Sequence, residues 1–462
     1  MTRRGLGSGA CAAALVLAAT PIASGDDAGA ARAGAFPPPV EEHRLANGLR
    51  VVLAPDDTLP DVSVVVQYGA GQSDDPDRKE GLAHVTEHVL FGAFRHGAHA
   101  RLLLQSGASY LNAHTGLDFT SYEETVVPGA LELALWLEGA RMATSAAAVD
   151  EDAVARERTI AAHEYLERAE PGFEAFGPLF EAAWDELFPE WHPYHLAADA
   201  LSALGRIGPE DVRAFAGTWY GPNNACLAIA GRFEAARALA LVQRHLGAIP
   251  PRPVPARPSL PPIAPPGNLW LDVDALVDHP LALMTWRGPK GDTPEDLALS
   301  VAARLLGERD GALVRTFVDG GRGALRITVS ERSAAAGGVF AVGLEPDKGR
   351  SLTDVLPAVQ AAMGAFPDGL TARELARAKK QARGELLADL ETSMGRARRL
   401  AARRAPPSWG LDDLDAVDRA SVVGAMRRFL SPEQRVTLVV RPSAQPVYGG
   451  AGVLRHRDRM TR

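Results

Sequence analysis

Three residues of one short segment, His84, Glu87 and His88, have the types and the spacing that metal-dependent hydrolysis requires. They form a His-x-x-Glu-His string inside an apolar stretch of helical character, residues 81–91. At about 100° per residue, the two histidines lie about 40° apart on one helix face, one turn removed. There both rings could bind one zinc ion at about 2.0–2.1 Å. Glu87 falls on the same side, where it could hold a metal-bound water and act as the general base.

The competing interpretation is a helix whose histidines are merely buried and hydrogen-bonded. Two histidines and a glutamate on an otherwise apolar face are costly to bury without a cation. The chain also contains its own comparison, because residues 80–92 (EGLAHVTEHVLFG) align without a gap with residues 295–307 (EDLALSVAARLLG). In that second copy the three positions are Leu299, Ala302 and Ala303. The fold therefore favours apolar residues there, and the first copy departs from this preference in all three places, which predicts metal binding.

A catalytic zinc ion needs a third protein ligand and an open position. The helical segment 153–166 offers Glu157 and Glu164, which are seven residues apart and share a face to within about 20°. One could bind the metal while the other orients a histidine from behind. The residues alone leave both assignments open, and they also allow two surface glutamates that pair with Arg156 and Arg158.

The elements that must position these residues occur twice. Residues 249–267 contain nine prolines and form an extended connector between two halves. Apolar runs typical of strands, 62–68 and 281–286, precede the two aligned helical segments, and residues 150–164 correspond to 371–385. Matching segments in the same order indicate an internal duplication.

Strand and helix blocks do not alternate strictly, so the α+β class is favoured over a doubly wound sheet. We predict two homologous domains, each a mostly antiparallel sheet packed with helices. Asn47-Gly48 predicts a hairpin near the start of the first. The predicted boundaries are a signal peptide and disordered start (1–33), an N-terminal metal-binding peptidase domain (40–248), the Pro-rich linker (249–267), a C-terminal domain lacking metal ligands (268–442) and a flexible tail (443–462).

Composition bounds location and partners. The 462 residues carry a net charge of −8 without a basic cluster, which excludes the usual nucleic-acid footprint. Arg3 and Arg4, then an apolar run over residues 10–22 and small residues, predict a secretory signal too short to anchor in a bilayer. We expect an exported protein, periplasmic or secreted, with no membrane span after signal removal. Since Cys11 lies in the signal, Cys226 remains alone, so neither an intrachain disulfide nor a thiolate zinc site is expected.

Five strings carry a family resemblance. In order they read LANGLRVVLAP, GLAHVTEHVLFG, LNAHTGLDFTSYEE, ERTIAAHE and YGPNNACLAIAG. From about residue 42 to residue 442 the chain resembles the pitrilysin-type (M16) zinc metallopeptidases, which include the mitochondrial processing peptidase and insulin-degrading enzyme. The resemblance implies one Zn²⁺ per chain and a peptide or unfolded polypeptide as substrate. It assigns the metal to His84, His88 and Glu164, a supporting role to Glu157, catalysis to Glu87 and substrate-backbone binding beside an edge strand to Asn112 and Ala113.

One part of the resemblance fails. Active family members place an Arg and a Tyr in the second half, in a string like LRExxGLAY, and the aligned stretch here has Asp319 and Arg326 at those positions. A shifted alignment offers Arg322 but no nearby Tyr. An acid is the wrong charge beside a developing oxyanion. Half-size members work as pairs of chains, so we expect the metal-bearing subunit of a heterodimer whose partner supplies the missing pair, a homodimer being the alternative.

Two other functions compete with the endopeptidase. The chain could be a catalytically weak or silent scaffold or binding subunit, as some relatives in respiratory complexes are. Such relatives typically lose the His-x-x-Glu-His set, which this chain keeps. A hydrolase of a non-peptide substrate could use the same ligands.

Overall fold

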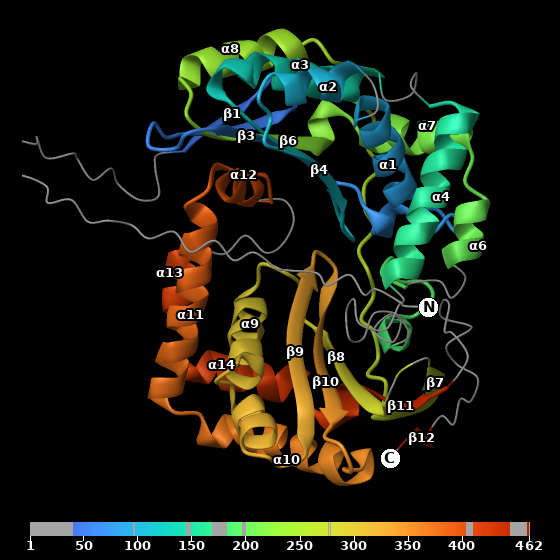
Figure 1. Ribbon diagram of the computed structural model, residues 1–462, viewed down its shortest axis with the longest axis vertical. Helices are drawn as coiled ribbons and strands as arrows, with labels where there is room; N and C mark the ends of the chain where they lie inside the picture. Colours follow the sequence, from blue (N-terminus) through green and yellow to red (C-terminus); the bar gives the residue numbers. More distant parts are fainter. Residues whose placement is uncertain are drawn as a thin grey trace, which may run out of the picture. The chain divides into compact units, whose positions relative to one another are not determined.

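The computed structural model shows two halves, each built on one β-sheet (Figure 1). It describes residues 40–95, 98–144, 149–168, 183–195, 200–275, 277, 279–402, 410–443 and 460–461. The predicted signal peptide lies outside the described residues, as do residues 444–459 and 462 of the predicted tail. Residues 37–462 form one compact unit. In the described part of the chain, no helix is both long and apolar enough to cross a membrane.

The first half opens with strands, continues with helices and ends with a strand and a helix. Its elements are β1 (Glu41–Arg44), β2 (Arg50–Pro55), β3 (Val62–Tyr68), η1 (Gln72–Asp74), α1 (Leu82–Arg95), α2 (Ala98–Gln105), β4 (Tyr110–Thr115), β5 (Thr120–Val126), η2 (Pro128–Ala130), α3 (Leu131–Thr144), α4 (Glu151–Arg168), α6 (Ala200–Gly205), α7 (Pro209–Trp219), η3 (Pro222–Asn224), β6 (Ala225–Gly231) and α8 (Ala235–Leu246).

The second half follows the same plan after the proline-rich connector. Its elements are β7 (Leu269–Ala275), β8 (Leu281–Gly288), α9 (Pro294–Gly307), η4 (Val314–Asp319), β9 (Ala324–Ala334), β10 (Gly337–Pro346), α10 (Leu352–Gly369), α11 (Ala372–Leu390), α12 (Ser393–Ala401), α13 (Leu411–Ala416), α14 (Arg419–Phe429), η6 (Pro432–Gln434), β11 (Arg435–Pro442) and β12 (Met460–Thr461).

The strand orders are β1-β2-β6-β3-β5-β4 in the first sheet and β12-β7-β11-β8-β10-β9 in the second. Five strands of each sheet are equivalent in this order, and the outer strands β1 and β12 are not, because β1 begins its half and β12 ends the other. In each, one pair is parallel, β2 with β6 and β7 with β11, and the other pairs are antiparallel. The structure confirms the predicted α+β class with two mostly antiparallel sheets, and the shared order supports the duplication. Strands β4 and β9 occupy the same edge position in their sheets.

The predicted hairpin joins β1 to β2, with Arg44 opposite Arg50. Gly48 adopts a φ of 88°, which a residue with a side chain rarely does. Asn47 turns its amide inward and donates hydrogen bonds to the carbonyl oxygens of Leu246 (2.8 Å) and Ile249 (3.0 Å). The hairpin thereby fixes the chain where the proline-rich connector begins.

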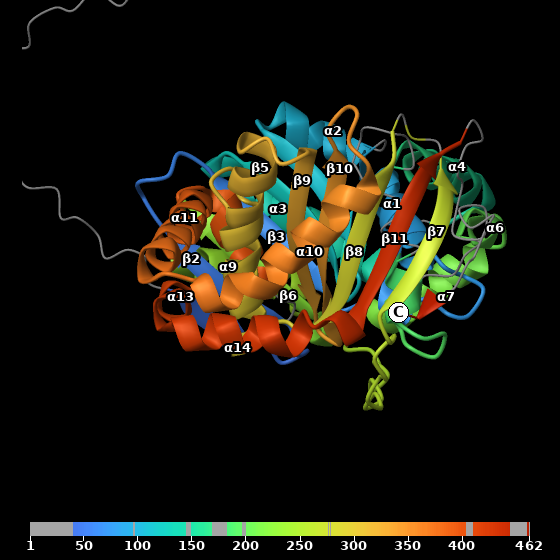
Figure 2. The same ribbon diagram turned by 90° about the horizontal axis from the view of Figure 1, so that it is seen from below.

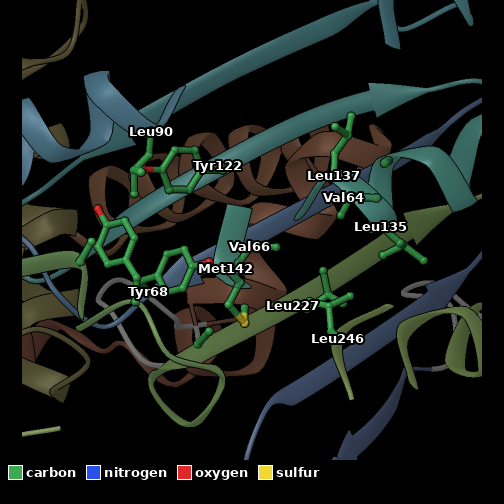
Figure 3. Packing of buried hydrophobic residues seen from close by; sticks show 14 of the residues in the cluster. Val64, Val66, Tyr68, Leu90, Tyr122, Leu135, Leu137, Met142, Leu227 and Leu246 are labelled. Atoms are coloured by element: carbon green, nitrogen blue, oxygen red, sulfur yellow. The ribbon is translucent and has the colours of Figure 1, made fainter. Parts of the chain in front are cut away.

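Helices α1, α3, α7 and α8 bury one face of the first sheet, and α1 also packs along α4 and β4. Figure 3 shows Val64, Val66 and Leu227 of this sheet among Leu135, Leu137 and Met142 of α3. The Tyr68 and Tyr122 rings lie close to Leu90 of α1. In the second half, α10 and α14 run across the strands (Figure 2), and α9 packs on β9. The core thus holds α1 rigidly against the sheet edge.

Each sheet has its other face covered by residues of the opposite half. Ala397 and Ala401 of α12 pack on the first sheet, against Val52, Val65 and Ala228. In return, aromatic and aliphatic side chains of residues 183–194 join the core on the second sheet; they are Ala183, Trp184, Leu187, Phe188 and Tyr194. We call this arrangement the reciprocal cover.

Candidate metal centre

Helix α1 carries the three residues of the His-x-x-Glu-His string at the edge of the first sheet. Its apolar side faces the core through Leu82, Val85 and Val89. On the opposite side, the His84 and His88 rings meet at 90° with centroids 4.5 Å apart. Their Nε2 atoms are 3.1 Å apart. One helix turn therefore brings the two imidazoles together as the spacing predicts.

Helix α4 brings Glu164 to the same point. Its Oε2 lies 3.4 Å from His84 Nε2 and 3.5 Å from His88 Nε2. A tetrahedral zinc ion with bonds of about 2.0–2.1 Å separates its ligand atoms by roughly 3.3 Å. The triangle of two imidazole nitrogens and one carboxylate oxygen therefore has the size and the chemistry of three zinc ligands. Among the described residues it is the only group of three or more His, Cys, Asp or Glu with this property.

The charges of this triangle depend on one another. Hydrogen bonding to His84, and then to His88, holds the pKa of Glu164 far below its ordinary value. Burial alone would lower the pKa of His88, but its hydrogen bond to Glu164 and the negative charges of Glu87, Glu164 and Glu157 outweigh burial and raise it. The site is thus strongly attractive to positive charge.

Glu157 approaches His88 from the other ring nitrogen. Its Oε2 is 3.7 Å from His88 Nδ1, and its Oε1 accepts a hydrogen bond from Arg156 Nε at 3.1 Å. The side chain is buried, and Gly92 makes room for it, since a Cβ at Gly92 would lie 2.7 Å from Glu157 Oε1. Of the two glutamates that the sequence left open, Glu164 meets the ligand nitrogens and Glu157 stands behind a ligand. This is the position of a residue that orients an imidazole.

Glu87 is buried beside the triangle and is held from the sheet. Its Oε2 accepts a hydrogen bond of 2.7 Å from Thr115 Oγ1 of β4. The sequence analysis missed Thr115, whose only signal was its place on the same strand as Asn112. A pocket of about 250 Å³ opens here, lined by His84, Glu87, His88, Phe91, Gly92, Asn112, Ala113, His114, Thr115, Glu157, Ile160 and Glu164.

Asn112 and Ala113 lie on β4, which pairs with β5 on one side only. Successive side chains of a strand point to opposite faces. Ala113 packs against the core, while the exposed Asn112 donates a 3.0 Å hydrogen bond from Nδ2 to the Tyr110 hydroxyl. The structure therefore brings both predicted substrate-binding residues to the pocket, on a strand that lies at the sheet edge among the described residues.

A buried ionic layer lies behind β5. The Arg141 guanidinium sits 4.2 Å from the centre of the Tyr122 ring and pairs with Glu138. Burial, followed by repulsion from Glu138, raises the pKa of Glu124 well above its ordinary value. One arginine and two glutamates thus lie together in a buried layer behind the strand that pairs with β4. No pattern in the sequence predicts this layer.

The second half supplies none of the residues that line the pocket within the described ranges. Asp319 ends η4 and is exposed, and Arg322 is exposed beside it. Arg326 is on β9 and pairs with Glu345. The positions that the family resemblance aligns with an Arg and a Tyr therefore do not line the pocket here.

Comparison with known proteins connects this site to a family. Residues 50–172 match the family described as insulinase (peptidase family M16), and residues 206–382 match the peptidase M16 inactive domain. An uncharacterised zinc protease of Mycobacterium leprae is 30% identical over 220 residues, 47% of this chain and 48% of its own. Subunit 1 of the mitochondrial cytochrome b-c1 complex of Homo sapiens is 25% identical over 285 residues, 61% of this chain and 58% of its own.

The chain thus spans about half the length of the curated relatives that it matches. Among solved structures, a protease from Helicobacter pylori superposes with a TM-score of 0.77 at 20% identity, over 88% of this chain and 100% of that one. This similarity shows the fold.

Proposed function

The chain belongs to peptidase family M16, and from this membership we propose that it is a zinc-dependent endopeptidase acting on peptides or unfolded segments. The observation that carries the proposal is the triangle of His84, His88 and Glu164, with separations of 3.1, 3.4 and 3.5 Å between ligand atoms. An inactive scaffold has no need of a donor set at this spacing.

The chain's own residues would act as follows. Zinc, when bound by His84, His88 and Glu164, supplies an acidified water and polarises the substrate carbonyl. Glu87 accepts a proton from the attacking water and returns it to the leaving amine. Thr115 fixes one oxygen of Glu87, which leaves the other to face the pocket. Glu157 holds the His88 ring at Nδ1.

Substrate would bind as an added strand on β4. Its free edge offers backbone N–H and C=O groups, so main-chain hydrogen bonds give affinity with little dependence on side chains. Asn112 and Ala113 lie on this strand beside the pocket. This geometry favours an extended or unfolded polypeptide over a folded protein.

The proposal includes a second subunit. The pocket lining comes from the first half alone, and the sequence has no tyrosine between Tyr220 and Tyr448. We infer that this chain is the metal-bearing member of a heterodimer, or less favourably a homodimer, whose partner brings the Arg and Tyr into a shared chamber. Strong cleavage of a quenched peptide by the purified chain alone would contradict this part.

The N-terminal sequence supports an exported location, periplasmic or secreted, as part of the same proposal. The second candidate function, a catalytically weak or silent subunit, draws on the similarity to the cytochrome b-c1 subunit. The complete metal triangle favours the enzyme over this alternative.

Glu87→Gln tests the central claim. We expect the variant to keep one zinc per chain, measured by elemental analysis, because Glu87 is not one of the three ligand residues. Peptide hydrolysis, measured with the chain and a candidate partner subunit together, should fall about 10²–10⁴-fold, because the general base is lost. Wild-type chain that binds no zinc, or a variant that cleaves at the wild-type rate, would refute the proposal.

A further inference from the structure

Helix α12 of the second half reaches the first sheet through two arginines. Arg396 donates to Asp56 Oδ2 at 2.5 Å. Arg398 donates to Glu123 Oε2 from Nε at 2.9 Å and from Nη2 at 2.5 Å. Both carboxylates belong to the first half, so each arginine bridges the two halves, with the Arg396 side chain buried and the Arg398 side chain about half exposed. They differ in where on the sheet the bridge ends.

The bridge of Arg398 ends beside the pocket. Glu123 lies on β5 directly opposite Asn112 on β4. Arg398 Nη2 also donates to the Tyr110 hydroxyl at 2.8 Å, and Asn112 Nδ2 donates to the same oxygen at 3.0 Å. One hydroxyl oxygen thus accepts two hydrogen bonds and links an arginine of the second half to a pocket-lining amide of the first.

This link restricts an exposed side chain. An exposed asparagine on a strand edge is otherwise free to rotate about its side-chain bonds. Holding Nδ2 on Tyr110 leaves Oδ1 as the acceptor that remains for a ligand. Tyr110 is itself held, because Arg398 is fixed by the buried carboxylate of Glu123 and its guanidinium lies 5.5 Å from the Tyr110 ring centre. The amide is therefore set in one orientation before any substrate arrives.

We propose that Arg398 and Tyr110 are positioning residues for peptide binding, which act through Asn112 and fix its Oδ1 as acceptor for a backbone N–H of the substrate. The inference rests on the proposed function. It gives the second half, which holds no metal ligand, a direct part in substrate recognition. A purely structural role for Arg398 is the alternative, and Arg396 provides the matched control for it.

Binding of a fluorescein-labelled, unstructured peptide to the zinc-loaded Glu87→Gln chain tests the proposal by anisotropy, without turnover. In this background we expect Tyr110→Phe, which removes one oxygen atom, to raise Kd about 3–10-fold. Arg398→Gln should raise it at least as much. Arg396→Gln should lower the thermal midpoint at least as much as Arg398→Gln, because Arg396 is the more buried arginine, yet leave Kd within about twofold, since its bridge ends at Asp56.

The outcomes separate the two claims. Peptide binding that is the same with and without the Tyr110 hydroxyl overturns this inference alone. Equal losses of affinity in Arg396→Gln and Arg398→Gln also overturn it, because they indicate a general loosening of α12. A zinc-loaded background chain that binds no peptide at all, either alone or with a candidate partner subunit, refutes the proposed function instead.

Discussion

Helices α1 and α9 occupy equivalent places in the two halves, and they solve the same packing problem in different ways. In α9 the positions equivalent to His84, Glu87 and His88 are Leu299, Ala302 and Ala303, all buried in the core of the second half. In α1 they carry two donors of the proposed metal site and the proposed general base. The same fold is stable with apolar residues there, so the metal site is an addition to the fold rather than a condition of it.

The long helices behind them repeat the comparison. Glu385 of α11 corresponds to Glu164 of α4, and it pairs with Arg304 of α9 at 2.6 Å. Ala378, the counterpart of Glu157, is buried. The second half therefore joins its two helices with apolar contacts and an ion pair at the rim. The first half joins them through the contacts of His84 and His88 with Glu164, which a bound cation would strengthen.

The largest effect is expected from His84→Leu/Glu87→Ala/His88→Ala, which copies α9 into α1. Zinc binding and hydrolysis should both be lost. The metal-free thermal midpoint should stay equal or rise, because half-buried polar groups are replaced by apolar ones. Elemental analysis and thermal unfolding with a chelator measure both results.

The reverse exchange in α9 is the control. A glutamate at position 302, where Ala302 is fully buried, should destabilise the protein by several kcal/mol for want of a partner. A metal-free α1 triple variant that melts well below the wild type would show that the donors serve the fold.

Glu164→Gln and Glu157→Gln should weaken zinc binding to different degrees. Loss of a ligand atom should weaken zinc binding by more than about 100-fold, whereas loss of a residue behind a ligand costs about 10–100-fold. Glu385→Gln, the matched change in the second half, should leave zinc affinity unchanged. Competition with a zinc-sensitive chelator gives the three affinities. A larger loss for Glu157→Gln would reverse the two assignments.

Gly92→Ala should have a smaller effect on zinc. Its Cβ would meet Glu157 Oε1 at 2.7 Å, and the flexible carboxylate can move away, so we expect a loss of zinc affinity below that of Glu157→Gln. Gly307 is the aligned residue in α9, and its Cβ would meet Val329 Cβ at 2.4 Å. Gly307→Ala should lower the free energy of unfolding by about 1–3 kcal/mol and leave zinc affinity unchanged. A larger loss of zinc affinity in Gly307→Ala than in Gly92→Ala would contradict the role given to Gly92.

The smallest expected effect is a pH dependence of the stability of the metal-free protein. The pKa of Glu164 lies below its ordinary 4.5. Its contribution to the free energy of unfolding is therefore present above that pH and is lost as the pH falls through the pKa of the folded state. The pKa of His88 lies above its ordinary 6.5, so its contribution is complete below that pH and is lost as the pH rises through the folded value. Both act together between these ordinary values.

The urea midpoint of metal-free Glu164→Gln should therefore fall further below wild type at pH 5.5 than at pH 8.5. The Glu385→Gln midpoint should differ from wild type equally at both, because its arginine partner keeps its charge. A difference that grows toward pH 8.5 would show that the histidines contribute little to holding Glu164.

Much of the fold was predictable because the same arrangement of strands and helices occurs in both halves of the chain. The aligned strings around His84 and Leu299 predict equivalent helices, and the structure places α1 and α9 there. The donors themselves follow from helical spacing. The choice between Glu157 and Glu164 did not follow from the residues, because both share one helix face, and only packing against α1 shows which carboxylate meets the Nε2 atoms.

Contacts between segments that lie far apart along the chain could not be predicted from the sequence. Thr115 bonds Glu87 only because β4 runs beside α1. Arg398 and Tyr110 are 288 residues apart, and no periodicity links an arginine of α12 to a tyrosine of an edge strand. The sequence around Gly92 does not indicate that this glycine makes room for Glu157, because the contact depends on how α4 packs against α1.

The reciprocal cover sets the order in which the chain can fold. Ser63 bonds Ser393 across 330 residues, and the apolar face of the first sheet is closed only when Ala397 and Ala401 arrive. Contacts of such sequence separation slow folding and leave apolar surface open in the meantime. Until residues near 400 have been synthesised, the first half therefore has an uncovered apolar sheet face.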